Sequence, residues 1–125
     1  MRHLMVLVGL ALLTGGPAAA MPAGDATRGA DLYDAKCGAC HSLDGNRVGP
    51  AHRGVYGRKA GSAPDYDYSP GVKASKIVWT EPTLDRWLTN PQETIPGARM
   101  GFRLDDPQDR ADVIAYLKQQ SAVKH

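Results

Sequence analysis

The sequence predicts a small, all-α domain, and three observations predict it. The chain has 125 residues, which suits one small domain. Three segments place apolar residues at helical spacing behind good capping residues, whereas no segment alternates apolar and polar residues as a strand would. The 14 Gly and 9 Pro residues indicate many turns. We therefore expect three main helices joined by ordered loops.

The first expected helix follows Asp25, a good N-cap, and ends near Cys37 with Tyr33 on its inner side. Residues 42–69 are rich in Gly and Pro and have no sustained period, so we expect an ordered loop there. Residues 70–76 are compatible with a short helical turn.

The second and third helices have clear boundaries. Thr80 caps the second helix, Pro82 is tolerated in its first turn, and Asn90-Pro91 ends it. Asp106-Pro107 begins the third. Apolar residues share one face in each helix: Leu84, Trp87 and Leu88 in the second, and Val113, Ile114 and Leu117 in the third.

Three helices and long loops in a domain this small do not easily bury a sufficient core. The aromatic supply is thin, at 6% of the residues. Two cysteines are too few for a disulfide scaffold. The sequence therefore predicts a bound cofactor that fills the middle of the domain.

Residues 1–20 predict a secretory signal peptide. Arg2 precedes an apolar run over residues 4–13, and Ala18-Ala19-Ala20 supplies the small residues of a cleavage site. The run is shorter than the roughly twenty residues that a membrane helix needs, so an uncleaved anchor is the less favoured alternative. We expect cleavage to leave residues 21–125 as one soluble domain in the periplasm.

The charge of the chain does not favour a nucleic-acid partner. Lys and Arg number 15 against 13 Asp and Glu, a formal charge of +2. Loss of Arg2 with the signal peptide would leave the mature domain at +1. So small an excess gives no support to binding driven by bulk charge.

The segment Cys37-Gly38-Ala39-Cys40-His41 has the C-x-x-C-H pattern of c-type haem attachment. Two thiols at this spacing can add across the two vinyl groups of a haem as thioethers. The following histidine, His41, then lies beneath the iron as an axial ligand. Export, the cysteine pair and the histidine all agree with covalent haem c, one per chain.

Three other interpretations of this segment compete with haem attachment. A thioredoxin-like redox pair needs a βαβ context that the sequence does not predict. A zinc site needs about four ligands, commonly cysteines and histidines together. A plain structural disulfide would not need the histidine.

Elimination points to Met100 as the second axial ligand. The other mature candidates include Met21 and His125, which lie at chain ends that are usually mobile. His52 follows His41 by only eleven residues and should lie on the same side of the ring. Met100 lies in a constrained loop, although a methionine can also simply fill a gap in a core. A His/Met pair raises the reduction potential relative to two histidines.

Several further stretches follow in a characteristic order along residues 24–120. They are Gly29-Ala30-Asp31-Leu32-Tyr33, Val48-Gly49-Pro50, Gly54-Val55-Tyr56-Gly57-Arg58-Lys59-Ala60-Gly61, Ile77-Val78-Trp79-Thr80, Ile95-Pro96-Gly97-Ala98-Arg99-Met100, and the segment from Pro107 to Leu117. With the haem motif, this series resembles the class I c-type cytochromes, the group of mitochondrial cytochrome c and bacterial cytochrome c2. The resemblance implies the class I fold, three main helices and ordered loops around one covalent haem.

The resemblance also implies a contact between the first and last helices. Gly29 and Tyr33 should meet Val113 and Tyr116. A glycine at such a crossing lets two helix backbones approach closely.

Further haem contacts follow from the resemblance. The Pro50 carbonyl should accept the proton of the outer nitrogen of the axial histidine, which fixes that ring. A buried propionate needs donors, because an unpaired buried carboxylate is costly. Phe102 should shield the methionine side of the ring. The donors implied for the inner propionate are Arg58, Tyr68 and Trp79.

Three positions depart from the family pattern. His52 stands where an aliphatic residue usually packs against the haem, so its polar ring must find a partner or reach solvent, and a surface position is the favoured alternative. Trp87 replaces a tyrosine whose hydroxyl can bond the methionine sulfur, and an indole cannot place a donor identically. Ala98 replaces a threonine that usually donates near a propionate.

These residues predict a one-electron carrier rather than an enzyme, because both axial positions would be filled by protein. We expect it to cycle Fe(III)/Fe(II) between a donor, such as a dehydrogenase or a bc1-type complex, and an acceptor such as an oxidase. It should act as a monomer or in transient complexes, since redox encounters use small interfaces. Its exposed haem edge should be ringed by basic residues such as Lys36, Arg47, Lys59, Arg99 and Arg103.

Two alternative functions remain at this stage. One is a haem subunit of a stable periplasmic dehydrogenase complex, for example one that oxidises sulfite. The other is a ligand-binding or peroxidatic haem protein in which Met100 dissociates readily.

Overall fold

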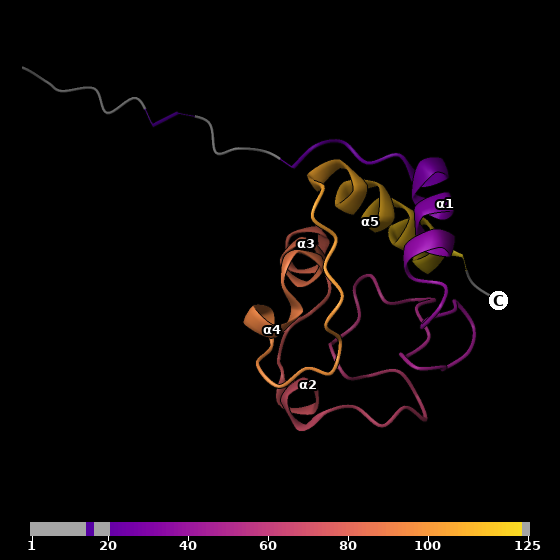
Figure 1. Ribbon diagram of the computed structural model, residues 1–125, viewed down its shortest axis with the longest axis vertical. Coiled ribbons are helices and arrows are strands. Elements are labelled where there is room, and N and C mark those ends of the chain that lie inside the picture. Colours follow the sequence, from indigo (N-terminus) through magenta and orange to yellow (C-terminus); the bar gives the residue numbers. More distant parts are fainter. Residues whose placement is uncertain (1–14, 17–20, 124–125) are drawn as a thin grey trace, which may run out of the picture.

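The computed structural model describes residues 15–16 and 21–123 and contains five helices (Figure 1). Within the described residues the chain forms no β-strand, only an isolated bridge between Lys59 and Val78. The predicted all-α class is confirmed, with three longer helices and two short ones. The helices are α1 (Ala26–Lys36), α2 (Pro70–Ala74), α3 (Glu81–Thr89), α4 (Pro91–Thr94) and α5 (Pro107–Ala122).

Side-chain caps set where the longest helices begin. The Asp25 carboxylate accepts hydrogen bonds from the backbone N–H groups of Thr27 and Arg28 at the start of α1. Asp106 caps α5 in the same way and accepts from Gln108 and Asp109. These bonds satisfy N–H groups that have no partner inside the helix, so both predicted starts are confirmed.

The predicted stop at Asn90-Pro91 is also a start. Asn90 ends α3, and its side-chain oxygen accepts from the backbone N–H of Glu93 at 3.3 Å. Pro91 then occupies the first position of α4, where its missing N–H costs nothing. This extra turn was not predicted, and it leads directly into the loop that carries Met100.

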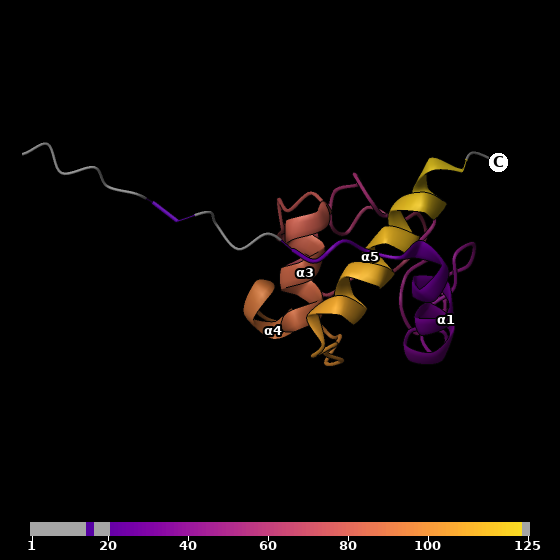
Figure 2. The ribbon, with the colours of Figure 1, turned by 90° about the horizontal axis from the view of Figure 1, so that it is seen from above.

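The first and last helices cross at a glycine. Figure 2 shows α5 running diagonally between α1 and α3. A Cβ built on Gly29 would lie 2.0 Å from the carbonyl oxygen of Asp112, so only glycine permits this crossing. One turn further along α1, the rings of Tyr33 and Tyr116 lie 5.4 Å apart. The expected contact between α1 and α5 is confirmed.

A buried carboxylate ties α5 to the start of α1. Asp112 is 1% exposed and accepts from the backbone N–H of Asp25 at 2.8 Å, from Gln108 at 2.9 Å and from Arg28. Burial alone would raise the pKa of Asp112, but these hydrogen bonds outweigh burial and hold its pKa below the usual value. The carboxylate is therefore charged in the neutral-pH fold.

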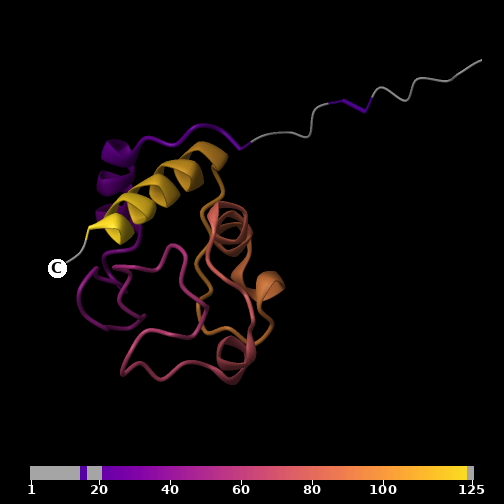
Figure 3. The same cartoon turned by 180° about the vertical axis from the view of Figure 1, so that it is seen from behind.

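The loop from α1 to α2 closes the molecule on the side away from α3 and α4 (Figure 3).

A buried Arg110 joins α5 to α3 through Asp85 at 2.7 Å, and it also donates to the carbonyls of Leu104 and Asp105. Helices on one side and loop on the other leave their apolar side chains facing a shared interior.

No helix among the described residues is both long enough and apolar enough to cross a membrane. The predicted signal peptide falls almost wholly outside the described residues, so its expectation stays a prediction.

Candidate functional site

A cavity of about 350 Å³ lies in the middle of the fold, within the range of small-molecule and cofactor sites. Its walls come from the end of α1, the long loop, α3, the loop after α4 and α5. All nine residues predicted for the site line it: Cys37, Cys40, His41, Pro50, Arg58, Tyr68, Trp79, Met100 and Phe102.

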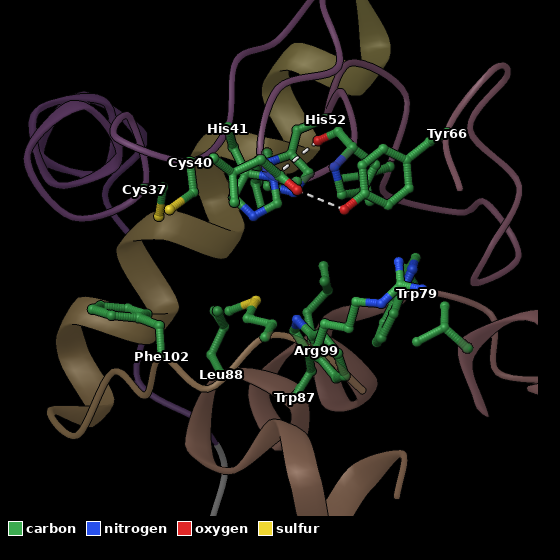
Figure 4. A pocket seen from close by; sticks show the side chains of 18 of the residues that line it. Cys37, Cys40, His41, His52, Tyr66, Trp79, Trp87, Leu88, Arg99 and Phe102 are labelled. Atoms are coloured by element: carbon green, nitrogen blue, oxygen red, sulfur yellow. Dashed lines mark hydrogen bonds between the residues drawn. The ribbon is translucent and has the colours of Figure 1, made fainter. Parts of the chain in front are cut away.

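The cysteine pair and His41 lie where α1 unwinds. The backbone N–H of Cys37 still bonds to the carbonyl of Tyr33 at 2.8 Å, and the N–H of His41 bonds to the carbonyl of Cys37 at 2.9 Å. This turn brings both sulfurs and the imidazole to one wall of the cavity (Figure 4). Both thiols are free, and burial raises the pKa of Cys37 to about 11.

The tautomer of His41 follows from its partner. Its Nδ1 lies 2.9 Å from the Pro50 carbonyl oxygen, which can only accept. Nδ1 therefore carries the proton and Nε2 keeps a free lone pair. Burial lowers the pKa of His41 more than this hydrogen bond raises it, so the ring is neutral and able to bind a metal. The contact implied for Pro50 is confirmed.

Gly49 gives the His41 ring its space. A Cβ at this position would lie 2.1 Å from Cε1 of His41 and 2.5–2.6 Å from both ring nitrogens. The backbone of Gly49 thus covers the face of the imidazole, and any side chain there would displace the ring. Sequence reasoning gave this glycine no role, although its place directly before Pro50 was a signal.

The opposite wall carries the methionine loop. Figure 4 shows Trp87, Leu88, Arg99 and Phe102 across the cavity from Cys37, Cys40 and His41. Met100, which lies between Arg99 and Phe102 in the sequence, also lines the cavity.

Two hydrogen-bonding side chains hold that loop in place. Gln92 in α4 donates to the Met100 carbonyl at 3.0 Å and also to the carbonyl of Ala98. Arg99 donates to the carbonyl of Asp67 at 2.7 Å. The loop is therefore held at Met100 and at the two residues before it by contacts with residues outside the loop.

The cavity wall also holds hydrogen-bond donors that are not fully satisfied within the protein. The guanidinium of Arg58 bonds to the carbonyls of Ala51 and Arg53, but its buried Nε has no hydrogen-bond partner. The Tyr68 hydroxyl accepts from the Ala63 N–H at 2.9 Å, which leaves its own proton free to donate. A buried unsatisfied donor is costly, and a carboxylate would satisfy it. These groups fit a haem propionate, as does the neighbouring indole of Trp79.

The favoured alternative for His52 was wrong, because its ring does not face the surface but finds partners, which was the other alternative. It stacks on His41 with ring centroids 4.0 Å apart and planes inclined by 20°, and its Nδ1 lies 3.0 Å from the Tyr33 hydroxyl. Burial, with smaller effects from His41 and Arg58, lowers the pKa of His52 well below the usual value, so this ring is neutral. Its predicted place on the same side as His41 is confirmed.

Two departures from the family pattern take up buried or half-buried positions. Trp87 lines the cavity with its ring 5.4 Å from that of Trp79. Ala98 is buried in the turn before Met100, where its N–H donates to the carbonyl of Ile95. Tyr66 also lines the cavity and donates to the carbonyl of Val48 at 2.6 Å, a contact that no sequence pattern indicated.

The zinc alternative finds no support in the arrangement of side chains. Across the described part of the chain, no three His, Cys, Asp or Glu residues gather closely enough to hold a metal ion together. The donor set of the cavity is instead the two imidazoles of His41 and His52, one thioether and two thiols.

Comparison with known proteins agrees with this geometry. The family described as cytochrome c matches residues 26–121. The chain belongs to the cytochrome c family. Cytochrome c of Theileria parva is 47% identical over 110 residues, which cover 85% of this chain and 95% of that protein. Cytochrome c of Sesamum indicum is 42% identical over 105 residues, covering 81% and 95% respectively.

The fold agrees as well. The solved structure of cytochrome cH from Methylobacterium extorquens matches with a TM-score of 0.74 and 41% identity, over 77% of this chain and 99% of that one. The class I cytochrome c fold is thus confirmed. This cytochrome c is an electron carrier with covalently bound haem c and redox protein partners, and it is not an enzyme.

Proposed function

We propose that this cytochrome c is an exported, periplasmic one-electron carrier with His41 and Met100 as axial ligands of its haem. Cys37 and Cys40 would hold the haem by thioether bonds. The observation that carries the proposal is the two-walled cavity, with a neutral imidazole on one wall and the methionine loop on the other. Haem supplies an iron that gains and loses one electron.

The hydrogen bonds around Met100 support a carrier rather than a ligand-binding protein. Gln92 holds the backbone of Met100, and Arg99 ties the same loop to the carbonyl of Asp67. A thioether presented from so fastened a loop would remain at the iron in both oxidation states. Both axial positions would then be filled, which leaves none open for substrate.

The walls of the cavity suit electron transfer with little rearrangement. Buried aliphatic side chains from α2, α3 and α5 keep water away, among them Val72, Leu84, Leu88, Val113 and Leu117. A dry, closely packed surround cannot reorient much when the charge at the centre changes by one. Arg58 and Tyr68 would neutralise and bond the inner propionate.

Electrons would enter and leave at the mouth of the cavity. Val48 and Phe102 are 74% and 40% exposed there, so the mouth has apolar surface. Of the basic residues predicted around it, Lys36 and Arg99 line the cavity and are exposed. A small apolar contact with a few local charges suits short-lived complexes with a donor dehydrogenase or bc1-type complex and an acceptor oxidase.

Replacement of Met100 by alanine tests the ligand assignment. Met100→Ala should open the iron, lower the reduction potential and let cyanide bind readily. Met21→Ala is the matched control, because Met21 packs against the core without lining the cavity. The account requires an unaltered potential in the control. An unaltered potential in Met100→Ala would show that another residue is the ligand.

Two further measurements test whether the protein is exported and whether it is a monomer or a subunit of a stable complex. N-terminal sequencing of the protein from the periplasmic fraction should read from Met21. Native mass spectrometry of that fraction should give a monomer. A stable larger complex would favour a dehydrogenase subunit, and cytoplasmic recovery of the uncleaved chain would contradict the proposed location.

A further inference from the structure

A polar pair, His52 and Tyr33, lines the same side of the cavity as His41, and the proposed axial ligation by His41 and Met100 does not account for it. Tyr33 is buried, at 4% exposed, and His52 is partly buried beside it. Burial of a hydroxyl and an imidazole is unfavourable unless they bond to each other or to the protein. Here they meet at 3.0 Å, so each satisfies the other.

The imidazole of His52 forms part of the enclosure around His41. The two rings stack at 4.0 Å between centroids, with planes only 20° from parallel. Pro50 fixes Nδ1 of His41, and the backbone of Gly49 lies against its face. The hydrogen bond from Nδ1 to Pro50 still allows the His41 ring to rotate about the line that joins the two atoms. The parallel ring of His52, in contact with His41, restricts that rotation.

Tyr33 in turn holds His52. Its hydroxyl can donate to a bare Nδ1 of His52 or accept from a protonated one, so the contact exists in either neutral tautomer. The Tyr33 ring lies edge-on to His52 at 5.7 Å and packs against Tyr116 at 5.4 Å. The position of His52 is thereby tied to the crossing of α1 and α5.

We propose that His52 is a positioning residue that sets the plane of the His41 imidazole, and that the Tyr33 hydroxyl keeps His52 in place. The inference rests on the proposed role of His41 as an axial ligand. In a ferric low-spin haem, the plane of the axial imidazole determines how unpaired spin is distributed over the porphyrin. The spread of the haem methyl resonances in proton NMR therefore responds to that plane, together with the orientation of the opposite axial ligand.

The test uses the ferric holoprotein and three variants. His52→Leu removes the stacked ring, and Tyr33→Phe removes only the hydroxyl that holds it. Tyr116→Phe is the matched control, because it deletes a hydroxyl from a tyrosine that packs on Tyr33 but lies outside the His52 hydrogen bond. We expect a changed spread of haem methyl shifts in His52→Leu, a smaller change of the same kind in Tyr33→Phe, and the native pattern in Tyr116→Phe.

Each other result has a definite meaning. A native methyl pattern in His52→Leu overturns the proposal. A native pattern in Tyr33→Phe alone overturns the part assigned to Tyr33. A shift in Tyr116→Phe as large as that in Tyr33→Phe would indicate general loosening of the helix crossing and would also overturn it.

Failure of the ligand assignment is distinguishable from failure of this inference. His41→Ala should abolish the low-spin spectrum of the holoprotein whatever the His52 variants do. If the low-spin spectrum persists in His41→Ala, the proposed ligand and the role of His52 both fall. If it is lost while His52→Leu keeps the native methyl pattern, only the role of His52 falls.

Discussion

The crossing of α1 and α5 makes Gly29 the position where the smallest change should cost the most stability. In Gly29→Ala the new methyl would lie 2.0 Å from the Asp112 carbonyl oxygen, 2.6 Å from its carbon and 3.0 Å from Cβ of Tyr116. The first two are backbone atoms of a helix, which cannot rotate away. The two helices must therefore separate.

The size of the effect follows from these contacts. Relief of the clash requires a separation of more than about 1 Å, enough to forfeit a quarter to a half of each nearby dispersion contact. Overpacking of this kind costs about 1–3 kcal/mol and at times more. Alanine recovers up to about 1 kcal/mol through its better helix propensity. We expect a net loss of about 2 kcal/mol, which corresponds to a melting temperature lower by roughly 8–16 °C for a domain of this size.

Thermal and urea unfolding of the ferric holoprotein measure this loss. Gly45→Ala is the matched control, because a Cβ there meets nothing closer than the Ser42 hydroxyl at 3.4 Å. We expect the control to stay within about 0.5 kcal/mol of the native protein. If Gly29→Ala has the same melting temperature and urea midpoint as the control, α1 and α5 do not cross tightly enough to require a glycine.

Three further predictions concern charge, space and the cofactor. Asp112→Asn should lose about 1–3 kcal/mol at neutral pH. Because the folded pKa of Asp112 is lowered, its contribution is present above the ordinary aspartate value and fades as pH falls through the folded value, so urea midpoints of variant and native protein should converge in acid. Gly49→Ala should displace the His41 ring and weaken the low-spin absorption spectrum, and an unchanged spectrum would argue against that contact. Cys37→Ser with Cys40→Ser should leave a largely unfolded chain, and a compact, protease-resistant double variant would contradict that.

The helices could be predicted because their signals are local. Asp25 and Asp106 cap helices by accepting from N–H groups two and three residues away. Because the partners are this close in the sequence, the capping residue can be recognised from the sequence alone. The start of α4 had a local signal too, since Asn90-Pro91 is both a stop and a good N-cap with proline at the first helical position.

The site was predictable where a short motif implies chemistry, and least so in the long loop. The spacing of Cys37, Cys40 and His41 placed three groups on one wall without any knowledge of the fold. His52 was misjudged because its partners, Tyr33 and His41, are set by how the loop folds back onto α1. A polar residue in a loop is usually exposed, and only three-dimensional packing shows the exception.

Covalent attachment of haem at Cys37 and Cys40 underlies the whole account, and intact mass spectrometry of the purified protein tests it most directly. The protein should be made in a host able to attach haem, and its mass compared with that of Cys37→Ser with Cys40→Ser. We predict that the native chain is coloured and, after denaturation, still heavier than its amino acids by one haem. A colourless native chain with the mass of its amino acids alone would contradict the account.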